Sequence, residues 1–168
     1  METVISTVIM IALLMMLLLG LSQNIFSSQA MLSESSQQLQ ERLQDQSRTA
    51  LASAGATTSP AGDSVTLIFQ NTGTTKLADF QNWDVVLQYT DAVGSAHVQW
   101  YPYPSQWVAQ IYQTVSPPVL EVVEPGILDP GEYLAVAVTV SPTVGTGTTN
   151  LATIAAPNGV TATTVFTH

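Results

Sequence analysis

The chain has 168 residues, with 12 acidic and 3 basic side chains and a formal net charge of −9 at pH 7. This length suits one globular domain with an appendage. The shortage of lysine and arginine argues against binding to nucleic acid or to anionic membrane surfaces. The chain contains no cysteine, which excludes a disulfide framework and a thiolate metal site.

The first predicted element is an apolar run from Val4 to Leu21 that is broken only by Ser6, Thr7 and Gly20. As a helix it would be about 27 Å long, close to the roughly 30 Å of a bilayer's hydrocarbon core. A surface helix normally carries a polar face. We therefore expect this run to be buried all round, either in lipid or among copies of itself.

The flanks of this run lack positive charge, since the first basic residue is Arg42. A secretory signal carries a basic segment before its apolar core, and a plain membrane anchor carries basic residues on its cytoplasmic side. Both absences predict that the chain is a mature form from which a basic leader has been removed.

The helix is expected to continue beyond the apolar run, because residues 22–51 contain neither glycine nor proline and are rich in Gln, Glu, Arg and Leu. Glu41 or Asp45 is placed to pair with Arg48 on this helix. The predicted division is a helix over 1–52, a flexible linker over 53–62 with small residues, glycine and proline, and a folded domain over 63–168.

Alternating apolar residues mark several short strands in the last part of the chain. The alternation covers Val65 to Phe69, Val85 to Tyr89, Leu134 to Val140 and Val160 to Phe166. Turn sequences such as Asn71-Thr-Gly73 and Asp129-Pro-Gly131 separate these strands. The pattern predicts an antiparallel β-sandwich, and therefore an α+β chain with a long hydrophobic N-terminal α-helix followed by that sandwich.

Aromatic residues gather in the middle of this domain. Trp and Tyr are enriched both in cores and at subunit interfaces. These residues could therefore form part of the core, a subunit interface or a surface that binds a ligand. The candidates for an interface on the outer domain are Trp83, Trp100, Tyr101, Tyr103, Trp107 and Tyr112.

Catalytic motifs are absent from the sequence. His97 lacks a G-x-S-x-G nucleophile elbow or any orienting motif, and Asp79, Asp84 and Asp91 do not match an EF-hand loop. The sequence therefore predicts no enzyme, no cofactor and no dedicated metal site, although an adventitious cation on the acidic domain is an alternative.

Three segments, residues 68–73, 126–132 and 157–160, resemble turns of the archaellins, the filament subunits of the archaeal flagellum, within the type IV pilin-like superfamily. The carrying motifs are Ile68-Phe-Gln-Asn-Thr-Gly73, Gly126-Ile-Leu-Asp-Pro-Gly-Glu132 and Pro157-Asn-Gly-Val160. The resemblance implies an immunoglobulin-like sandwich, removal of a leader by a prepilin-type peptidase, and polymerisation by an assembly machinery. The glutamate that many bacterial pilins carry at the fifth mature position has no counterpart here, where the only nearby acid is Glu2.

The resemblance implies a structural subunit of an extracellular motility filament, which sits in the membrane before assembly and then bundles with copies of itself. The alternatives are an adhesive type IV pilus subunit and a membrane-anchored, stator-like binding domain. The residues expected to form the polymerisation helix are Val4, Ile5, Val8, Ile9, Ile11, Leu13, Leu14, Leu17, Leu18, Leu21 and Phe26.

Overall fold

The computed structural model describes the backbone of residues 2–168 and the side chains of residues 5–17, 29 and 31–168. The chain divides into two compact units, residues 1–43 and 44–168. One helix, α1 (Glu2–Arg48), forms the first unit and enters the second with its last turn. The second unit otherwise contains the strands and one short 3-10 helix, η1 (Phe80–Asn82).

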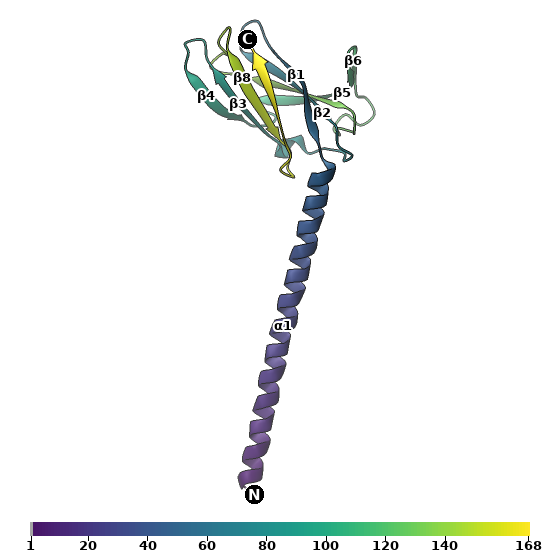
Figure 1. Ribbon diagram of the computed structural model, residues 1–168, viewed down its shortest axis with the longest axis vertical. Coiled ribbons are helices and arrows are strands. Elements are labelled where there is room, and N and C mark those ends of the chain that lie inside the picture. Colours follow the sequence, from purple (N-terminus) through teal and green to yellow (C-terminus); the bar gives the residue numbers. More distant parts are fainter. Residues whose placement is uncertain (1) are drawn as a thin grey trace. The chain divides into compact units, whose positions relative to one another are not determined.

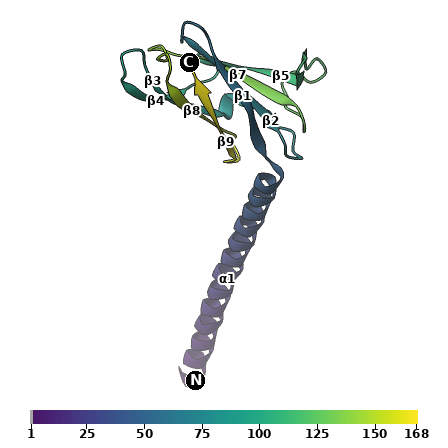
Figure 2. The same ribbon diagram turned by 45° about the horizontal axis from the view of Figure 1, so that its top comes forward.

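The strands form two antiparallel sheets, which make two layers in Figure 1 and Figure 2. The five-stranded sheet has the order β1-β2-β7-β5-β6 and the four-stranded sheet the order β4-β3-β8-β9. The bounds are β1 (Leu51–Thr58), β2 (Ser64–Asn71), β3 (Asp84–Thr90), β4 (Ala96–Tyr101), β5 (Trp107–Val115), β6 (Pro118–Leu120), β7 (Tyr133–Thr139), β8 (Thr149–Ala155) and β9 (Thr161–Thr167).

The core lies between the inner faces of the two sheets. The period of two in the sequence places every second residue of a strand on the inner face, and the alternation expected for β2, β3, β7 and β9 is confirmed by their burial patterns. Fully buried apolar side chains on these strands include Val65, Leu67, Phe69, Val85, Leu87, Leu134, Val136 and Val138.

The predicted fold class, α+β with a long hydrophobic helix, was wrong. The structure is mostly β, with sheets of five and four antiparallel strands. Nor is α1 hydrophobic along its length: among its described side chains, residues 5–17 are largely apolar, whereas 31–48 are dominated by Gln, Ser, Glu and Arg. The lack of glycine and proline keeps the second segment helical without making it apolar. Within the described residues, no helix is long and apolar enough to cross a membrane.

The segment expected as a linker, 53–62, is largely strand. β1 (Leu51–Thr58) pairs antiparallel with β2, with an irregularity between Ser53 and Gly55, and α1 ends at Arg48 rather than Ala52. The small residues of this stretch indicated flexibility, but pairing with β2 supplies the backbone hydrogen bonds that hold it.

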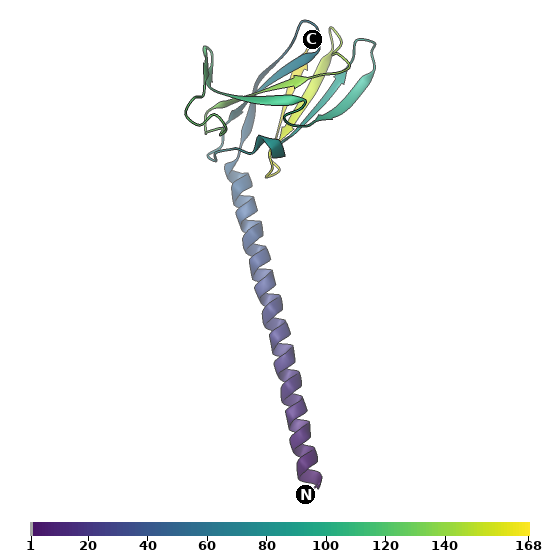
Figure 3. The same cartoon turned by 180° about the vertical axis from the view of Figure 1, so that it is seen from behind.

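The hairpin of β5 and β6 stands at one edge of the sandwich and is visible from behind in Figure 3. All three residues of β6 are exposed. Beyond it, Val122 and Val123 are the most exposed apolar residues of the segment that returns to β7.

Candidate functional site

The described apolar residues of the predicted polymerisation helix are all exposed in the single chain. Their exposed fractions run from 51% for Ile11 to 65% for Leu17. Three neighbouring methionines share this exposure, including Met16 at 74%. The side chains of Val4, Leu18, Leu21 and Phe26 lie outside the described residues. Within the chain, therefore, nothing described covers the apolar part of α1.

The six aromatic candidates for an interface fall into two groups. Trp83, Tyr101 and Trp107 are at most 2% exposed and belong to the core of the sandwich. Trp100 is 55% exposed and donates from Nε1 to the Asp84 carboxylate at 2.8 Å, while Tyr103 and Tyr112 are half-buried. Burial also raises the pKa of the Tyr101 hydroxyl. Of the six, Trp100 therefore offers the most surface to a partner.

The last turn of α1 meets two of the turns on which the archaellin resemblance rests. Thr72 and Gly73 donate their backbone N–H groups to the Ala50 carbonyl at 2.9 and 3.1 Å, and Thr74 donates to the Arg48 carbonyl at 2.8 Å. These bonds satisfy carbonyls at the C-terminal end of the helix and just beyond it, where intrahelical partners run out. The turn at residues 71–74 therefore caps the end of α1.

The second turn, at residues 157–159, holds the same end of the helix through side chains. Asn158 donates from Nδ2 to Thr49 Oγ1 at 2.8 Å, and Gln46 donates from Nε2 to the Asn158 carbonyl at 2.6 Å. Thr49 in turn donates its hydroxyl to the Asp45 carbonyl at 2.8 Å. We call residues 44–50, 71–75 and 157–159 the junction; all of them belong to the second compact unit.

Asn71 ties the junction to the third turn of the resemblance. Its side chain is fully buried; Nδ2 donates to the carbonyls of Thr75 and Leu128 at 2.8 and 3.1 Å, and Oδ1 accepts from Gly73 N–H at 3.1 Å. Its backbone carbonyl accepts from Gly131 N–H at 2.7 Å. One asparagine therefore links the cap of α1 to the Leu128-Asp-Pro-Gly131 turn.

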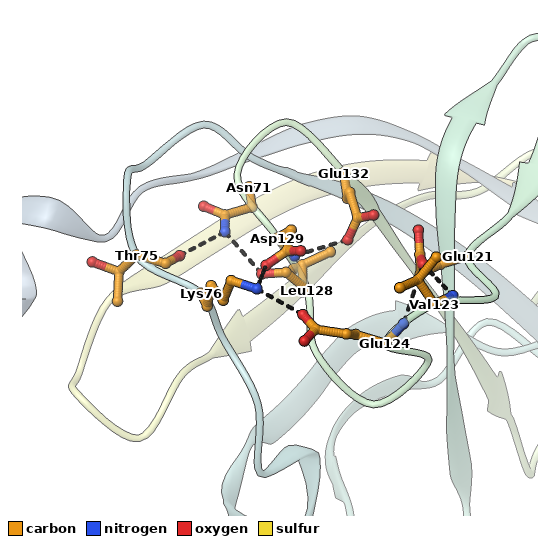
Figure 4. A network of polar contacts seen from close by, with 9 residues as sticks. All are labelled: Asn71, Thr75, Lys76, Glu121, Val123, Glu124, Leu128, Asp129 and Glu132. Atoms are coloured by element: carbon orange, nitrogen blue, oxygen red, sulfur yellow. Dashed lines mark hydrogen bonds and ion pairs between the residues drawn. The ribbon is translucent and has the colours of Figure 1, made fainter.

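A network of charged groups surrounds that third turn (Figure 4). Lys76 Nζ lies 2.6 Å from Glu124 and 3.1 Å from Asp129, which raises the lysine pKa. Glu132 accepts from Asp129 N–H at 2.8 Å. Since Lys76 stands on the strand-to-strand loop after β2, the network connects that loop to the β6–β7 segment.

Glu121 extends the network toward the β5–β6 hairpin. Its carboxylate accepts from Gln113 Nε2 at 2.7 Å and from Val123 N–H at 2.6 Å. These donors, with Glu132, lower the pKa of Glu121 to about 2. Burial raises the pKa of Glu132, and this effect outweighs the hydrogen bond from Asp129 N–H, which lowers it. The pKa values of the two neighbouring glutamates are therefore shifted in opposite directions.

His97 has a partner that sequence reasoning missed. Its Nε2 lies 2.8 Å from the Asp91 carboxylate, whose other oxygen accepts from the N–H groups of Val93 and Ser95. The His97 ring, next to Asp91, lowers the pKa of that carboxyl, and it stacks on Tyr89. The pair fixes the β3–β4 turn and has no nucleophile motif beside it. In the described part of the chain, no group of His, Asp and Glu side chains is arranged to hold a metal ion.

Comparisons with known proteins find structural likeness only. No protein-family model and no curated protein sequence matches the chain. A solved structure described as the archaellum periplasmic stator protein FlaG from Sulfolobus acidocaldarius is similar with a TM-score of 0.53 and 20% identity, over 70% of this chain and 99% of that one.

Two further structures are similar. The stator complex of FlaF and FlaG from the same organism has a TM-score of 0.51 and 21% identity, over 69% of this chain and 87% of that one. The archaeal flagellum of Methanospirillum hungatei strain JF1 has a TM-score of 0.61 and 13% identity, over 96% of this chain and 90% of that one. At these identities the likeness shows a shared fold, and all three structures are described as parts of an archaellum rather than as enzymes.

Proposed function

We propose that the chain is a structural component of an archaellum-type machine, and that it acts as a filament subunit whose α1 helices bundle with those of other copies. The observation that carries this proposal is the uncovered apolar segment at residues 5–17. Exposed apolar surface of this extent marks an interaction site. Burying one Leu or Ile side chain is worth roughly 1.5–3 kcal/mol, so copies that pack these segments together gain a large stabilisation.

The geometry of such an assembly follows from the division of the chain. The apolar segment would lie inside the polymer and the acidic sandwich outside, where its negative charge keeps neighbouring filaments apart. A head-to-tail contact that does not close produces a helical polymer. On this proposal the partners are copies of the chain, the location is the cell surface, and the membrane stage and peptidase implied by the resemblance precede assembly.

The extent of the structural likeness supports a filament subunit. The archaeal flagellum structure is matched over 96% of this chain, whereas the two stator structures are matched over 70% and 69%. A likeness that covers 96% includes residues outside the sandwich, and in particular most of α1.

A stator-like domain is the second candidate, favoured by a different observation. The chain of the solved FlaG structure is matched over 99% of its length, so this chain contains a counterpart to nearly all of it. In that case the sandwich would bind a partner in the cell envelope and α1 would serve as its anchor.

Substitution of Leu14 by Asp tests the filament proposal, and extraction of the wild-type protein separates it from the stator-like domain. In a filament subunit this change should abolish assembly, because it places a carboxylate inside the apolar helix bundle. The sandwich should stay folded, which the β signal in circular dichroism measures. Ser33→Asp, in the polar part of α1, is the matched control and should still give filaments in negative-stain images. Filaments from Leu14→Asp would contradict the proposal. Wild-type protein that stays monomeric or dimeric after extraction in mild detergent would favour the stator-like domain.

A further inference from the structure

Most charged side chains of residues 44–168 have a hydrogen-bond or ion-pair partner within the chain. Among the carboxylates of residues 44–168, seven accept a hydrogen bond or contact a cation. The pairs are Asp63 with Ser59, Asp84 with Trp100, Asp91 with His97, Glu121 with Gln113, Glu124 and Asp129 with Lys76, and Glu132 with the Asp129 backbone. Asp45 and Asp79 are the exceptions in this part of the chain, since neither side chain has a partner there.

Asp79 also has an unusual backbone. It precedes η1 with φ 55° and ψ 45°, in the left-handed region, and its side chain makes no capping bond. Aspartate enters this region more readily than most residues, usually because its carboxylate bonds to nearby backbone. Here the carboxylate makes no such bond and is exposed.

Asp79 and Asp45 line the same hollow of about 220 Å³, which we call the junction hollow and which Lys76, Trp83 and Asn158 also line. The Lys76 ammonium is already engaged by Glu124 and Asp129. The hollow is therefore lined by two acidic residues whose carboxylates have no cation beside them in the described part of the chain.

Two cations of the chain are unpaired as well. Arg42 and Arg48 are exposed, and within the described residues neither guanidinium contacts a carboxylate; the pairs expected between Arg48 and Glu41 or Asp45 do not form. Arg48 belongs to the same compact unit as Asp79. The second compact unit therefore carries both an unpaired positive group and a hollow lined by two unpaired carboxylates.

We propose that Arg48 of one copy docks in the junction hollow of a second copy, against Asp79 and Asp45. The inference rests on the proposed self-assembly and names a contact that sets its register. A guanidinium matches carboxylates through paired hydrogen bonds, which fixes orientation as well as charge. In an acidic chain such a contact supplies specific attraction between bodies that otherwise repel each other.

General charge repulsion and this contact predict opposite results for Asp79→Asn. The substitution changes the formal net charge from −9 to −8, so repulsion alone predicts easier assembly. Docking predicts the reverse. Because an exposed ion pair contributes little free energy, its loss should raise the critical concentration for assembly roughly two- to fivefold. Asparagine tolerates the left-handed backbone, so the fold is kept.

Two matched variants complete this measurement by sedimentation of polymer. Asp63→Asn makes the same charge change at a carboxylate that already has a partner, and should assemble as well as wild type or better. Arg48→Gln should assemble as poorly as Asp79→Asn, whereas Arg42→Gln should have the smaller effect. If Arg42→Gln has the larger effect, or Asp79→Asn assembles as easily as Asp63→Asn, the docking contact is wrong.

A charge swap tests the contact directly. Arg48→Glu and Asp79→Arg should each reduce assembly, and the double variant should recover at least half of the loss, with thermal melts showing that each variant is folded. No recovery in folded double variant would overturn the contact while leaving helix-driven assembly intact. If wild-type protein forms no polymer at all, the proposed function itself fails, and the two failures are thereby distinguished.

Discussion

Asn158 and Thr49 are 109 positions apart in the sequence, and a 2.8 Å hydrogen bond from Asn158 Nδ2 to Thr49 Oγ1 joins them at the end of α1. The Asn158 carbonyl accepts a second bond from Gln46. The last helical turn is therefore held by the C-terminal hairpin as well as by the turn after β2. In a filament of the proposed kind, this is where a load on the helical core would reach the outer domain.

Asn158→Ala should loosen this hold. Loss of the amide leaves the Thr49 hydroxyl without its donor, at a cost of about 1 kcal/mol in the free energy of unfolding. Thr49→Ala should cost a similar amount, and the double variant should cost less than the sum, because both single changes remove the same bond. Chemical denaturation of the four proteins measures the coupling. Strict additivity would show that the bond contributes nothing.

Asn71→Ala should be more damaging than Asn158→Ala. The side chain is fully buried, and its removal leaves the carbonyls of Thr75 and Leu128 and the N–H of Gly73 without this partner. The Leu128 carbonyl and the Gly73 N–H each keep a backbone partner, so the cost is that of three lost hydrogen bonds, at about 0.5–1.5 kcal/mol each. We therefore expect a loss of about 2 kcal/mol or more by denaturant titration. Asn82→Ala, at an exposed asparagine of η1, is the control and should change stability little.

The strands with strict alternation were predictable because each has one face in the core. Residues 65–69 and 134–138 show this plainly. β1 could not be found this way, since its small residues are half-buried at most and its pairing with β2 is irregular near Gly55. Its position depends on hydrogen bonds to β2, which no local pattern of side chains records.

The aromatic candidates show a second limit of the sequence. Residue type did not distinguish Trp100, which is exposed, from Tyr101, which is buried beside it. Their faces follow from pairing with β3, where Tyr101 lies opposite the buried Val85 and Trp100 opposite Val86. The turns of the archaellin resemblance were visible as motifs, but their meeting at α1 through Asn71 and Asn158 was not, because it is a tertiary arrangement.

Glu132→Gln should change how stability depends on pH. The folded-state pKa of Glu132 is raised above its ordinary 4.5, so its contribution is present below pH 4.5 and is lost as pH rises through the folded pKa. Glutamine removes this loss. Between pH 4.5 and 7, the melting temperature of Glu132→Gln should therefore fall less, or rise more, than that of the wild type.

Glu121 contributes in the opposite direction, and lower on the pH scale. Its pKa is lowered to about 2, so its contribution is present above 4.5 and is lost as pH falls from there toward 2. Glu121→Gln should therefore weaken the fall of the melting temperature below pH 4.5. Above pH 4.5 the change in melting temperature due to Glu132 should remain. Glu34→Gln, on α1 and outside the network, serves as the control. Parallel curves for Glu132→Gln and Glu34→Gln would contradict the role of Glu132.

Gly73→Ala should disrupt the cap of α1. A Cβ on Gly73 would lie 2.5 Å from the Arg48 carbonyl oxygen and 2.6 Å from the Ala50 backbone nitrogen, so the turn and the helix end cannot both keep their places. Because both close contacts are backbone atoms, no side-chain rotation relieves them. Overpacking of this kind typically costs 1–3 kcal/mol, and we expect a loss of about 2 kcal/mol or more by denaturant titration.

Gly126→Ala is the matched control, because a Cβ there meets nothing within 4 Å. It should leave stability nearly unchanged. The damage from Gly73→Ala should also be local: amide hydrogen exchange should speed up at Thr72, Gly73 and Thr74, whose N–H groups bond to the end of α1, while the buried strands β3 and β8 stay protected. Equal exchange in the two variants would show that the close approach of Gly73 to the helix end does not hold the junction together.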